Sequence, residues 1–313
     1  MYNKILPNIQ ILEDCDMGKF CSFKAGGKAT VAVINSVEEL MMALQKLSEA
    51  NMKYMILGNG TNTLFRDEGY DGLVIKLGDG FDFECLEGLD RDGVHMGNDP
   101  KKLKIGDKTE VLVGAKMNMA TFAKLLLMDE ISGFEFASGI PGSIGGAIFM
   151  NGGAYGSEMK DIVKKVWAVS PDGKEIKCFT NSEMEFGYRH SILQDNGYIA
   201  IEVLFELEKG KGEDILAEMR ELAEKRNSKQ PIKYPSAGST FKRPEGNFAG
   251  KLIEECNLKG TKVGGAEVSE LHAGFIINKD GATATDILEL IMLVQETVYK
   301  EKGVMLVPEV RIV

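Results

Sequence analysis

A run of glycines near the middle of the chain is the feature most suggestive of chemistry. Residues 139–156 read GIPGSIGGAIFMNGGAYG, with seven glycines in eighteen positions and Gly139, Gly142 and Gly145 at intervals of three. Because glycine lacks Cβ, it accepts positive φ and allows backbone N–H groups to approach a bulky polyphosphate. The segment therefore predicts contact with a phosphate-bearing ligand. Tight turns between strands would explain the same glycines.

A second glycine-bearing loop, LGNGTNTLF at residues 57–65, follows a predicted strand. Its turn supplies Gly58, Asn59, Gly60, Thr61 and Asn62. The two loops could clamp one pyrophosphate. Neither is a Rossmann or P-loop signature, because Thr63 occupies the third glycine place of GxGxxG and no Gly-Lys-Ser/Thr follows. The residues alone therefore predict a phosphate contact without identifying the ligand.

The elements that would position these loops alternate between helix and strand in the first half of the chain. Ser36 and Glu39 are spaced as a capping box, which predicts a helix from there to about Ala50. Hydrophobic patterning predicts strands at residues 54–57, 73–77 and 110–114 and a helix at residues 119–128. This half is expected to be α/β.

Antiparallel pairing is expected from residue 164 onward. KKVWAVS, a Ser-Pro-Asp-Gly turn at residues 170–173 and EIKCF predict a hairpin. Further elements are expected as a strand at 199–206, helices at 213–226 and 286–302, and a final strand. A Pro-bearing connection follows the first of these helices, and we place a domain boundary near residues 207–212.

Length and composition indicate an enzyme-sized globular protein. The chain has 313 residues, 44% hydrophobic and 27% charged, which is a folded balance and favours two or three domains. It shows neither a signal-peptide stretch nor the roughly 18 apolar residues needed to span a bilayer. We therefore expect a cytoplasmic protein without membrane insertion. The five cysteines form no CxxC pair, so reduced thiols are expected.

The net charge of −10 argues against general affinity for nucleic acid or anionic lipid, because both require excess Lys and Arg. Residues 225–262 nevertheless hold nine Lys or Arg against three Glu, and this stretch could face a small polyanion. The Gly- and charge-rich residues 79–108 read as a surface excursion or an extended hairpin without an assigned function. No metal site is predicted, because no metal-ligand pair includes His95, His190 or His272.

Eight motifs occur in the order typical of one enzyme family. They are SFKAGGKA at 22, LGNGTNTLF at 57, EFASGIPGSIGGAIFMNGGAYG at 135, GYRHS at 187, AGSTFKRP at 237, AGKLIEECNLKG at 249, HAGFIIN at 272 and VPEVRIV at 307. From about Ser22 to Val313, apart from residues 79–108, the chain resembles the UDP-N-acetylenolpyruvoylglucosamine reductases (MurB). The short interval after GYRHS resembles the shorter subclass, which lacks an inserted loop with a substrate-covering tyrosine.

The resemblance implies an α+β fold and a two-step reduction. A two-part FAD-binding domain of the vanillyl-alcohol-oxidase (PCMH) type is expected at residues 1–206, with subdomains of about 1–67 and 68–206. An α+β substrate-binding domain is expected at residues 207–313. In the implied reaction NADPH reduces FAD, which then reduces the enolpyruvyl ether of UDP-N-acetylenolpyruvoylglucosamine.

Three residues match the family's catalytic roles. Arg189 in GYRHS would stabilise an enolate, since its planar guanidinium suits two oxygens. Ser239 in AGSTF would donate a proton to the enolate carbon with assistance, and Glu309 would act beside the enolate, orienting Arg189 or relaying a proton. The substrate contacts implied are Tyr188, Lys229 and Arg243. The FAD contacts implied are Gly58, Asn59, Gly60, Thr61, Asn62, Gly139, Ile140, Gly142, Ser143, Gly145 and Gly146.

Two other functions are compatible with parts of this pattern. One is a different FAD-linked oxidase of the same fold, which would lack the Arg, Ser and Glu set. The other is a flavin or UDP-sugar binding protein without catalytic activity, against which the complete trio of Arg189, Ser239 and Glu309 argues.

Overall fold

The computed structural model describes residues 1–85 and 108–313, so most of the expected excursion at 79–108 lies outside the described residues. The described residues form two compact units, each assembled from separate stretches of the chain. Unit 1 comprises Met1–Ile11, Val31–Gly58 and Leu73–Glu224, and unit 2 comprises Leu12–Thr30, Asn59–Gly72 and Lys225–Val313. The domain boundary near residue 207 stays a prediction.

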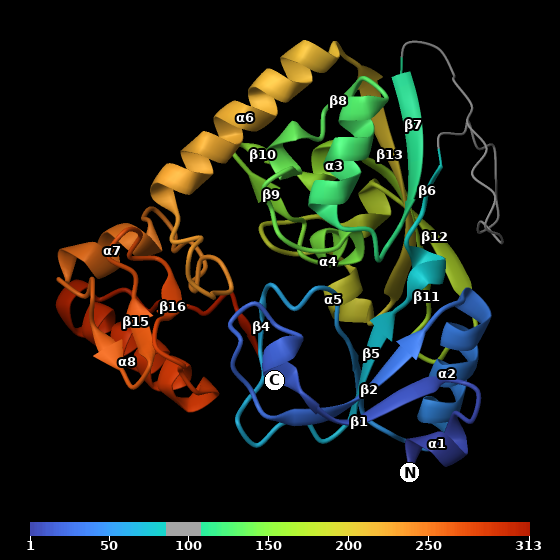
Figure 1. Cartoon of the computed structure of the whole chain (residues 1–313), viewed down its shortest axis with the longest axis horizontal. Coiled ribbons are helices and arrows are strands. Elements are labelled where there is room, and N and C mark those ends of the chain that lie inside the picture. The colour runs from blue at the N-terminus through green and yellow to red at the C-terminus, as the bar shows by residue number, and fades with distance from the viewer. Residues whose placement is uncertain (86–107) are drawn as a thin grey trace. The chain divides into compact units, whose positions relative to one another are not determined.

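The first sheet has the strand order β1-β2-β5-β3. Its strands are β1 (Gln10–Asp16), β2 (Lys28–Ile34), β3 (Tyr54–Ile56) and β5 (Leu73–Leu77). β3 and β5 are parallel, with Tyr54 opposite Leu73, and the connection between them contains the loop at 57–65. The short helix α1 (Tyr2–Ile5) precedes β1, and α2 (Val37–Glu49) lies beside the sheet (Figure 1). α2 buries one apolar stripe, formed by Leu40, Ala43, Leu44 and Leu47.

The cap of α2 differs in one bond from the predicted capping box. The Ser36 hydroxyl accepts the N–H of Glu39 at 3.2 Å, which confirms Ser36 as the N-cap. The Glu39 carboxylate accepts the N–H of Asn35 at 2.8 Å instead of that of Ser36. The second bond of the capping box, from the Glu39 carboxylate, was therefore expected at the N–H of Ser36 but forms with that of the preceding residue.

The larger sheet is antiparallel and has the order β12-β11-β13-β7-β6, with β8 also on β13. Its strands are β6 (Glu84–Cys85), β7 (Lys108–Gly114), β8 (Ile131–Ser132), β11 (Val163–Val169), β12 (Ile176–Thr180) and β13 (Ile199–Lys209). The accompanying helices are α3 (Met119–Met128), α4 (Ile144–Phe149) and α5 (Leu193–Asn196). The hairpin predicted around residues 170–173 is confirmed, because Val169 pairs with Ile176.

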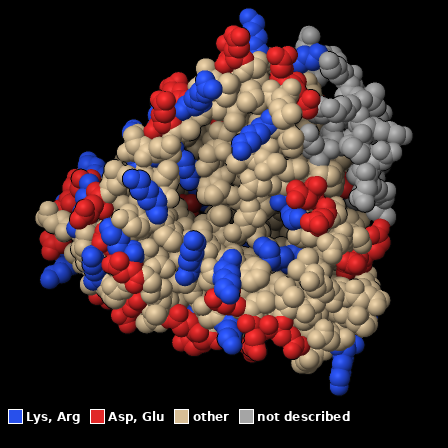
Figure 2. Space-filling model, in the orientation of Figure 1, with Lys and Arg blue, Asp and Glu red and all other residues tan. Residues whose placement is uncertain are grey.

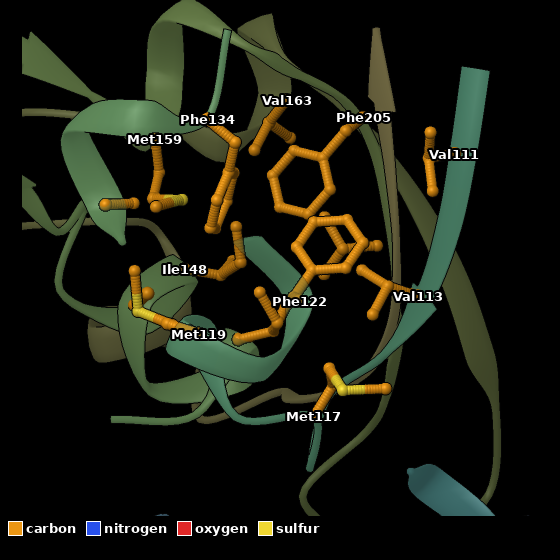
Figure 3. Packing of buried hydrophobic residues seen from close by; sticks show 14 of the residues in the cluster. Val111, Val113, Met117, Met119, Phe122, Phe134, Ile148, Met159, Val163 and Phe205 are labelled. Carbon is orange, nitrogen blue, oxygen red and sulfur yellow. The ribbon is translucent and has the colours of Figure 1, made fainter. Parts of the chain in front are cut away.

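Aromatic rings fill the core that joins this sheet to its helices (Figure 3). Phe122 of α3 meets Phe134 edge to face, with ring centroids 4.9 Å apart. Phe205 of β13 packs on both rings, at centroid distances of 5.6 Å and 5.7 Å. Ile148 of α4 belongs to the same buried cluster. Such ring pairs add stabilisation beyond the area that they bury, so the core holds α4 and the glycine-rich segment firmly in unit 1.

Unit 2 is built around a small antiparallel sheet and a long helix. The sheet consists of β14 (Lys262–Val263), β15 (Ala266–Val268) and β16 (Ile276–Asn278), with helices α7 (Ala249–Glu255) and α8 (Ala284–Lys302). β17 (Arg311–Ile312) pairs in parallel with β4 (Thr63–Leu64), so a segment from early in the chain belongs to this unit. α8 ends at Gly303 with φ +70°, as predicted. α6 (Gly212–Lys229) extends three residues beyond the predicted end at residue 226.

The N-terminus of α8 is capped by a residue distant in sequence. The Asp67 carboxylate accepts the N–H groups of Ala284 at 2.9 Å and Thr285 at 2.8 Å, and also the Thr285 hydroxyl at 2.6 Å. Burial opposes ionisation of Asp67, but the hydrogen bonds from Thr285 and Ala284 outweigh it and lower the pKa. Thr283 and Asp286 add a capping box that the sequence analysis missed. The stretch at 59–72 is thereby attached to α8.

Charged side chains of both signs are interspersed over the face shown in Figure 2, without one continuous basic surface. Within residues 1–85 and 108–313, no helix combines the length and apolar character needed to cross a membrane. Cys15, Cys21, Cys178 and Cys256 are free cysteines in the structure.

Replacing Asp67 with alanine should lower the free energy of unfolding at pH 7 by about 1 kcal/mol, as expected for loss of a helix cap. The pKa of Asp67 is lower in the folded state than in the unfolded chain. Its stabilisation is therefore present above about pH 4 and is lost as the pH falls through the folded-state value. Denaturant unfolding from pH 7 downward, with Asp71→Ala as the control, measures this. If the loss in free energy of unfolding caused by Asp67→Ala stayed constant down to the lowest pH at which the protein folds, Asp67 would not cap α8 as an ionised carboxylate.

Candidate active site

The loop after β3 presents consecutive backbone N–H groups. Those of Gly58, Asn59 and Gly60 have no acceptor among the described residues. Two carbonyl groups of this loop are engaged, because Gly58 accepts a hydrogen bond from Lys76 Nζ at 2.7 Å and Gly60 accepts the N–H of Ser22 at 3.0 Å. Consecutive N–H groups of this kind can bind an anion.

Gly58 also touches the glycine-rich segment within unit 1. A Cβ on Gly58 would lie 2.7 Å from the Ser143 hydroxyl oxygen, which is closer than real side chains approach. That hydroxyl caps α4 by accepting the N–H of Gly146 at 3.3 Å. The N–H groups of Gly139 and Gly142 likewise find no acceptor in the described part of the chain, and Gly139 is exposed. The structure thus places Gly58 beside the glycine-rich segment, and both have backbone N–H groups without an acceptor among the described residues.

Other glycines of the segment serve packing and turns. A Cβ on Gly145 would lie 3.0 Å from that of Ala115, and the Gly145 N–H is already bonded to the Ala115 carbonyl at 2.8 Å. A Cβ on Gly153 would lie 2.5 Å from the opposite strand in the hairpin of β9 (Gly153–Ala154) and β10 (Ser157–Glu158), and Gly156 turns it with φ +98°. The turn interpretation therefore holds for Gly153 and Gly156, whereas Gly145 serves close packing of α4.

Lys76 is a candidate residue that the sequence analysis missed. Its ammonium lies on β5 and donates to Gly58. Burial, and to a smaller extent the positive charge of Lys116, lower the pKa of Lys76. A bound anion would raise the pKa of Lys76 again by stabilising its positive charge. The available signal was a lysine within the otherwise apolar strand LVIKL.

Arg189 occupies a tight turn in which Gly187 and His190 exchange both backbone hydrogen bonds. Its φ of +55° lies in the left-handed region, which is uncommon for residues other than glycine. Such strain persists where the surroundings hold it, and it concentrates at functional sites. The Arg189 Nη2 atom lies 3.4 Å from the Gly153 carbonyl oxygen.

Side chains fasten this turn to the end of the glycine-rich segment. The buried Asn151 donates to the Gly187 carbonyl at 2.9 Å. The Ser191 hydroxyl and the Gln194 amide both donate to the Phe149 carbonyl, at 2.9 Å and 2.8 Å. Unit 1 therefore holds the predicted catalytic arginine beside the predicted cofactor segment.

Ser239 and Glu309 lie on neighbouring segments of unit 2. The Glu309 N–H donates to the carbonyl of Thr240, the residue after Ser239, at 2.8 Å. Ser239 is exposed and Glu309 is partly exposed, so both are accessible to a ligand. The Glu309 carbonyl accepts the side-chain amide of Asn62 at 3.1 Å. The structure thus connects Asn62, expected as a cofactor contact, to the predicted catalytic glutamate.

The predicted substrate contacts divide between the units. Lys229 is exposed on the last turn of α6 in unit 2. Arg243, also in unit 2, places its guanidinium 4.0 Å from the centroid of the Phe248 ring. Tyr188 of unit 1 is 50% exposed, and the Arg189 guanidinium lies 5.4 Å from its ring centroid. All three side chains are accessible to a ligand.

The described histidines make local contacts. His190 Nε2 lies 2.9 Å from the Asp195 carboxylate. His272 Nδ1 accepts the N–H of Gly274 at 3.1 Å, and burial lowers its pKa. His95 lies outside the described residues.

Two protein families match successive parts of the chain. Residues 29–178 match an FAD binding domain, and residues 230–313 match the C-terminal domain of UDP-N-acetylenolpyruvoylglucosamine reductase. The chain is also similar to the crystal structure of MurB from Thermus caldophilus, with a TM-score of 0.77 and 32% identity over 97% of this chain and 98% of that one. These matches, together with the mixed helices and sheets of the described residues, confirm the predicted α+β fold with an FAD-binding domain followed by a C-terminal domain.

Curated relatives match nearly end to end. The UDP-N-acetylenolpyruvoylglucosamine reductase of Alkaliphilus oremlandii is 45% identical over 311 residues, covering 99% of this chain and 95% of the relative. That of Clostridioides difficile is 44% identical over 309 residues, covering 98% and 95%. Similarity of this extent spans every motif identified above. The chain therefore belongs to the UDP-N-acetylenolpyruvoylglucosamine reductase family.

Proposed function

We propose that the protein is UDP-N-acetylmuramate dehydrogenase, an FAD enzyme that uses NADPH to reduce UDP-N-acetylenolpyruvoylglucosamine to UDP-N-acetylmuramate for peptidoglycan synthesis. The observation that carries the proposal is the 45% identity, over 99% of the chain, to a reductase named for this substrate. The FAD binding domain matched at residues 29–178 accounts for the cofactor. We place the reaction in the cytoplasm, where NADPH and nucleotide sugars are available.

The open glycine backbones fit the pyrophosphate of FAD. The N–H groups of Gly58, Gly139 and Gly142 have no acceptor within residues 1–85 and 108–313, and a Cβ on Gly58 would displace the Ser143 hydroxyl. These groups would bind the phosphate oxygens, and the Lys76 ammonium beside Gly58 would add positive charge. FAD, when bound, supplies the transfer of hydride from NADPH to the methylene carbon of the substrate.

Arg189 would stabilise the negative charge that forms on the substrate. Hydride addition leaves enolate character next to the carboxylate, and preorganised positive charge lowers the energy of that state. The planar guanidinium can donate to two oxygens at once. Because Asn151 holds the turn that carries Arg189, little reorganisation would accompany the reaction.

Ser239 would donate the proton that completes the reduction at the enolate carbon. A hydroxyl is normally a poor acid, so a neighbouring group must assist it. Glu309 is the proposed assistant, because its backbone is bonded to the residue after Ser239. Its carboxyl group would relay the proton to the hydroxyl.

Lys229 and Arg243 would bind the diphosphate of the UDP group, and Tyr188 would contact the substrate by stacking or hydrogen bonding. Their exposure leaves them accessible to a ligand of this size. Only α5 (Leu193–Asn196) separates the Arg189 turn from β13. We therefore place the chain in the subclass without the inserted tyrosine loop, which must cover its substrate differently.

The purified protein should be yellow with bound FAD. NADPH should bleach the flavin absorbance without oxygen, and the enolpyruvyl sugar should restore it. A protein that cannot take up FAD would contradict the proposal. Bleaching by NADPH without recovery on adding the sugar would favour an oxidase with the same fold, and sugar binding without bleaching would favour a binding protein.

Ser239→Ala should retain flavin reduction by NADPH but slow flavin reoxidation by the sugar by more than about a hundredfold, the scale of lost acid catalysis. Stopped-flow absorbance separates the two half-reactions. Ser236→Ala removes a hydroxyl from the same segment and serves as the control. An unchanged reoxidation rate in Ser239→Ala would refute the role given to this hydroxyl.

Lys76→Met should weaken FAD binding by about tenfold or more, because a charge-assisted contact at the Gly58 loop is lost while most of the unbranched side chain is kept. Titration of the apoprotein with FAD measures the effect. Lys53→Met, an exposed lysine of the same unit, should bind FAD like the wild type. Equal affinities of the Lys76 and Lys53 variants would exclude a role for Lys76 in holding the cofactor.

A further inference from the structure

The backbone of Glu309 is held from two directions within unit 2. Its N–H donates to the Thr240 carbonyl at 2.8 Å, and its carbonyl accepts the Asn62 side-chain amide at 3.1 Å. The first bond connects it to the segment of Ser239. The second connects it to the loop at residues 58–62.

Asn62 is itself firmly placed. Its carbonyl accepts the N–H of Arg311 at 3.0 Å, so Asn62 contacts the segment of Glu309 through both backbone and side chain. The parallel pairing of β4 with β17 begins at the next residue, Thr63, which faces Arg311. Because Asn62 is fixed in this way, the hydrogen bond from its side-chain amide can hold the peptide group after Glu309 in one orientation.

The loop that carries Asn62 has little freedom to move. The Gly60 carbonyl accepts the N–H of Ser22 at 3.0 Å. A Cβ on Gly60 would lie 2.0 Å from the Phe20 carbonyl oxygen, so the loop backbone is pressed against this neighbouring segment. The position of Asn62 therefore follows from the packing of the loop.

We propose that Asn62 is a positioning residue for Glu309 in the second half-reaction. The inference rests on the proposed function and adds a role for the side chain of this loop residue. Without the amide donor, the peptide group after Glu309 can rotate. The carboxyl group of Glu309 then no longer lies where it can act on the Ser239 hydroxyl. Misplacement of a reacting group by about 1 Å can cost a hundredfold in rate, so loss of a single bond of this kind matters.

The test is a double-mutant cycle between Asn62 and Glu309, followed as flavin reoxidation by the enolpyruvyl sugar. Asn62→Leu keeps the size of the side chain but removes the donor. With FAD saturating, it should slow reoxidation at least about tenfold while leaving flavin reduction by NADPH within about twofold of the wild type, whatever its effect on FAD affinity. In the Glu309→Gln background the same substitution should have less than about a twofold effect, because there is no carboxylate left to position.

A matched control is available on the same segment. Gln295 donates its side-chain amide to the Leu306 carbonyl at 2.7 Å, three residues before Glu309. Gln295→Met removes an equivalent bond and any stability that it contributes, and it should leave reoxidation unchanged. Asn62→Ala, which also removes the donor and adds no charge, should behave like Asn62→Leu and provides a second variant if the leucine variant folds poorly.

Several results would overturn the inference. Equal slowing by Asn62→Leu in the wild-type and Glu309→Gln backgrounds would show that Asn62 does not act through Glu309. Equal slowing of flavin reduction and of reoxidation in the FAD-saturated Asn62 variants would show that this side chain serves the cofactor. Unchanged reoxidation in both Asn62 variants would refute the role while leaving the proposed function intact. A wild-type protein that the sugar cannot reoxidise would remove the proposed function and this inference together.

Discussion

The close approach of Gly60 to the backbone of residue 20 is the constraint on which the loop at 58–62 depends. A Cβ at this position would lie 2.0 Å from a carbonyl oxygen, and φ is +64°, so only glycine is compatible with the fold here. The approach sets the path of the loop, in which the N–H groups of Gly58, Asn59 and Gly60 have no acceptor among the described residues and Asn62 contacts Glu309. Gly60 thereby fixes the path of a candidate phosphate-binding loop and the position of the side chain that contacts the backbone of Glu309.

Much of the fold is predictable because local hydrophobic patterning encodes it. β5 and α3 begin and end at the residues expected from their apolar spacing, and the hairpin of β11 and β12 follows from its turn. The pairing of β4 with β17 is not predictable in this way, since the two strands are short and lie far apart in sequence. The Asp67 cap of α8 escaped notice for the same reason, because nothing near either residue indicates the partner.

The candidate site shows a similar division. Glycine density correctly indicated open backbone at Gly139 and Gly142 but could not separate them from Gly145, whose role in packing depends on Ala115 across the core. Lys76 could have been noticed as a charge in an apolar strand. The contact of Asn62 with Glu309 could not, because side-chain direction is set by tertiary packing. Residue roles came from family resemblance, and the structure adds how unit 1 holds its arginine and unit 2 its serine and glutamate.

The central claim is that these separately held groups act on one substrate. A crystal structure of the protein with FAD and the enolpyruvyl sugar tests it most directly. The account predicts Arg189 within hydrogen-bond distance, about 3 Å, of the substrate carboxylate, with the Ser239 hydroxyl and the Glu309 carboxyl group at the enolpyruvyl carbons. A sugar bound with its enolpyruvyl group away from any of these three side chains would contradict it.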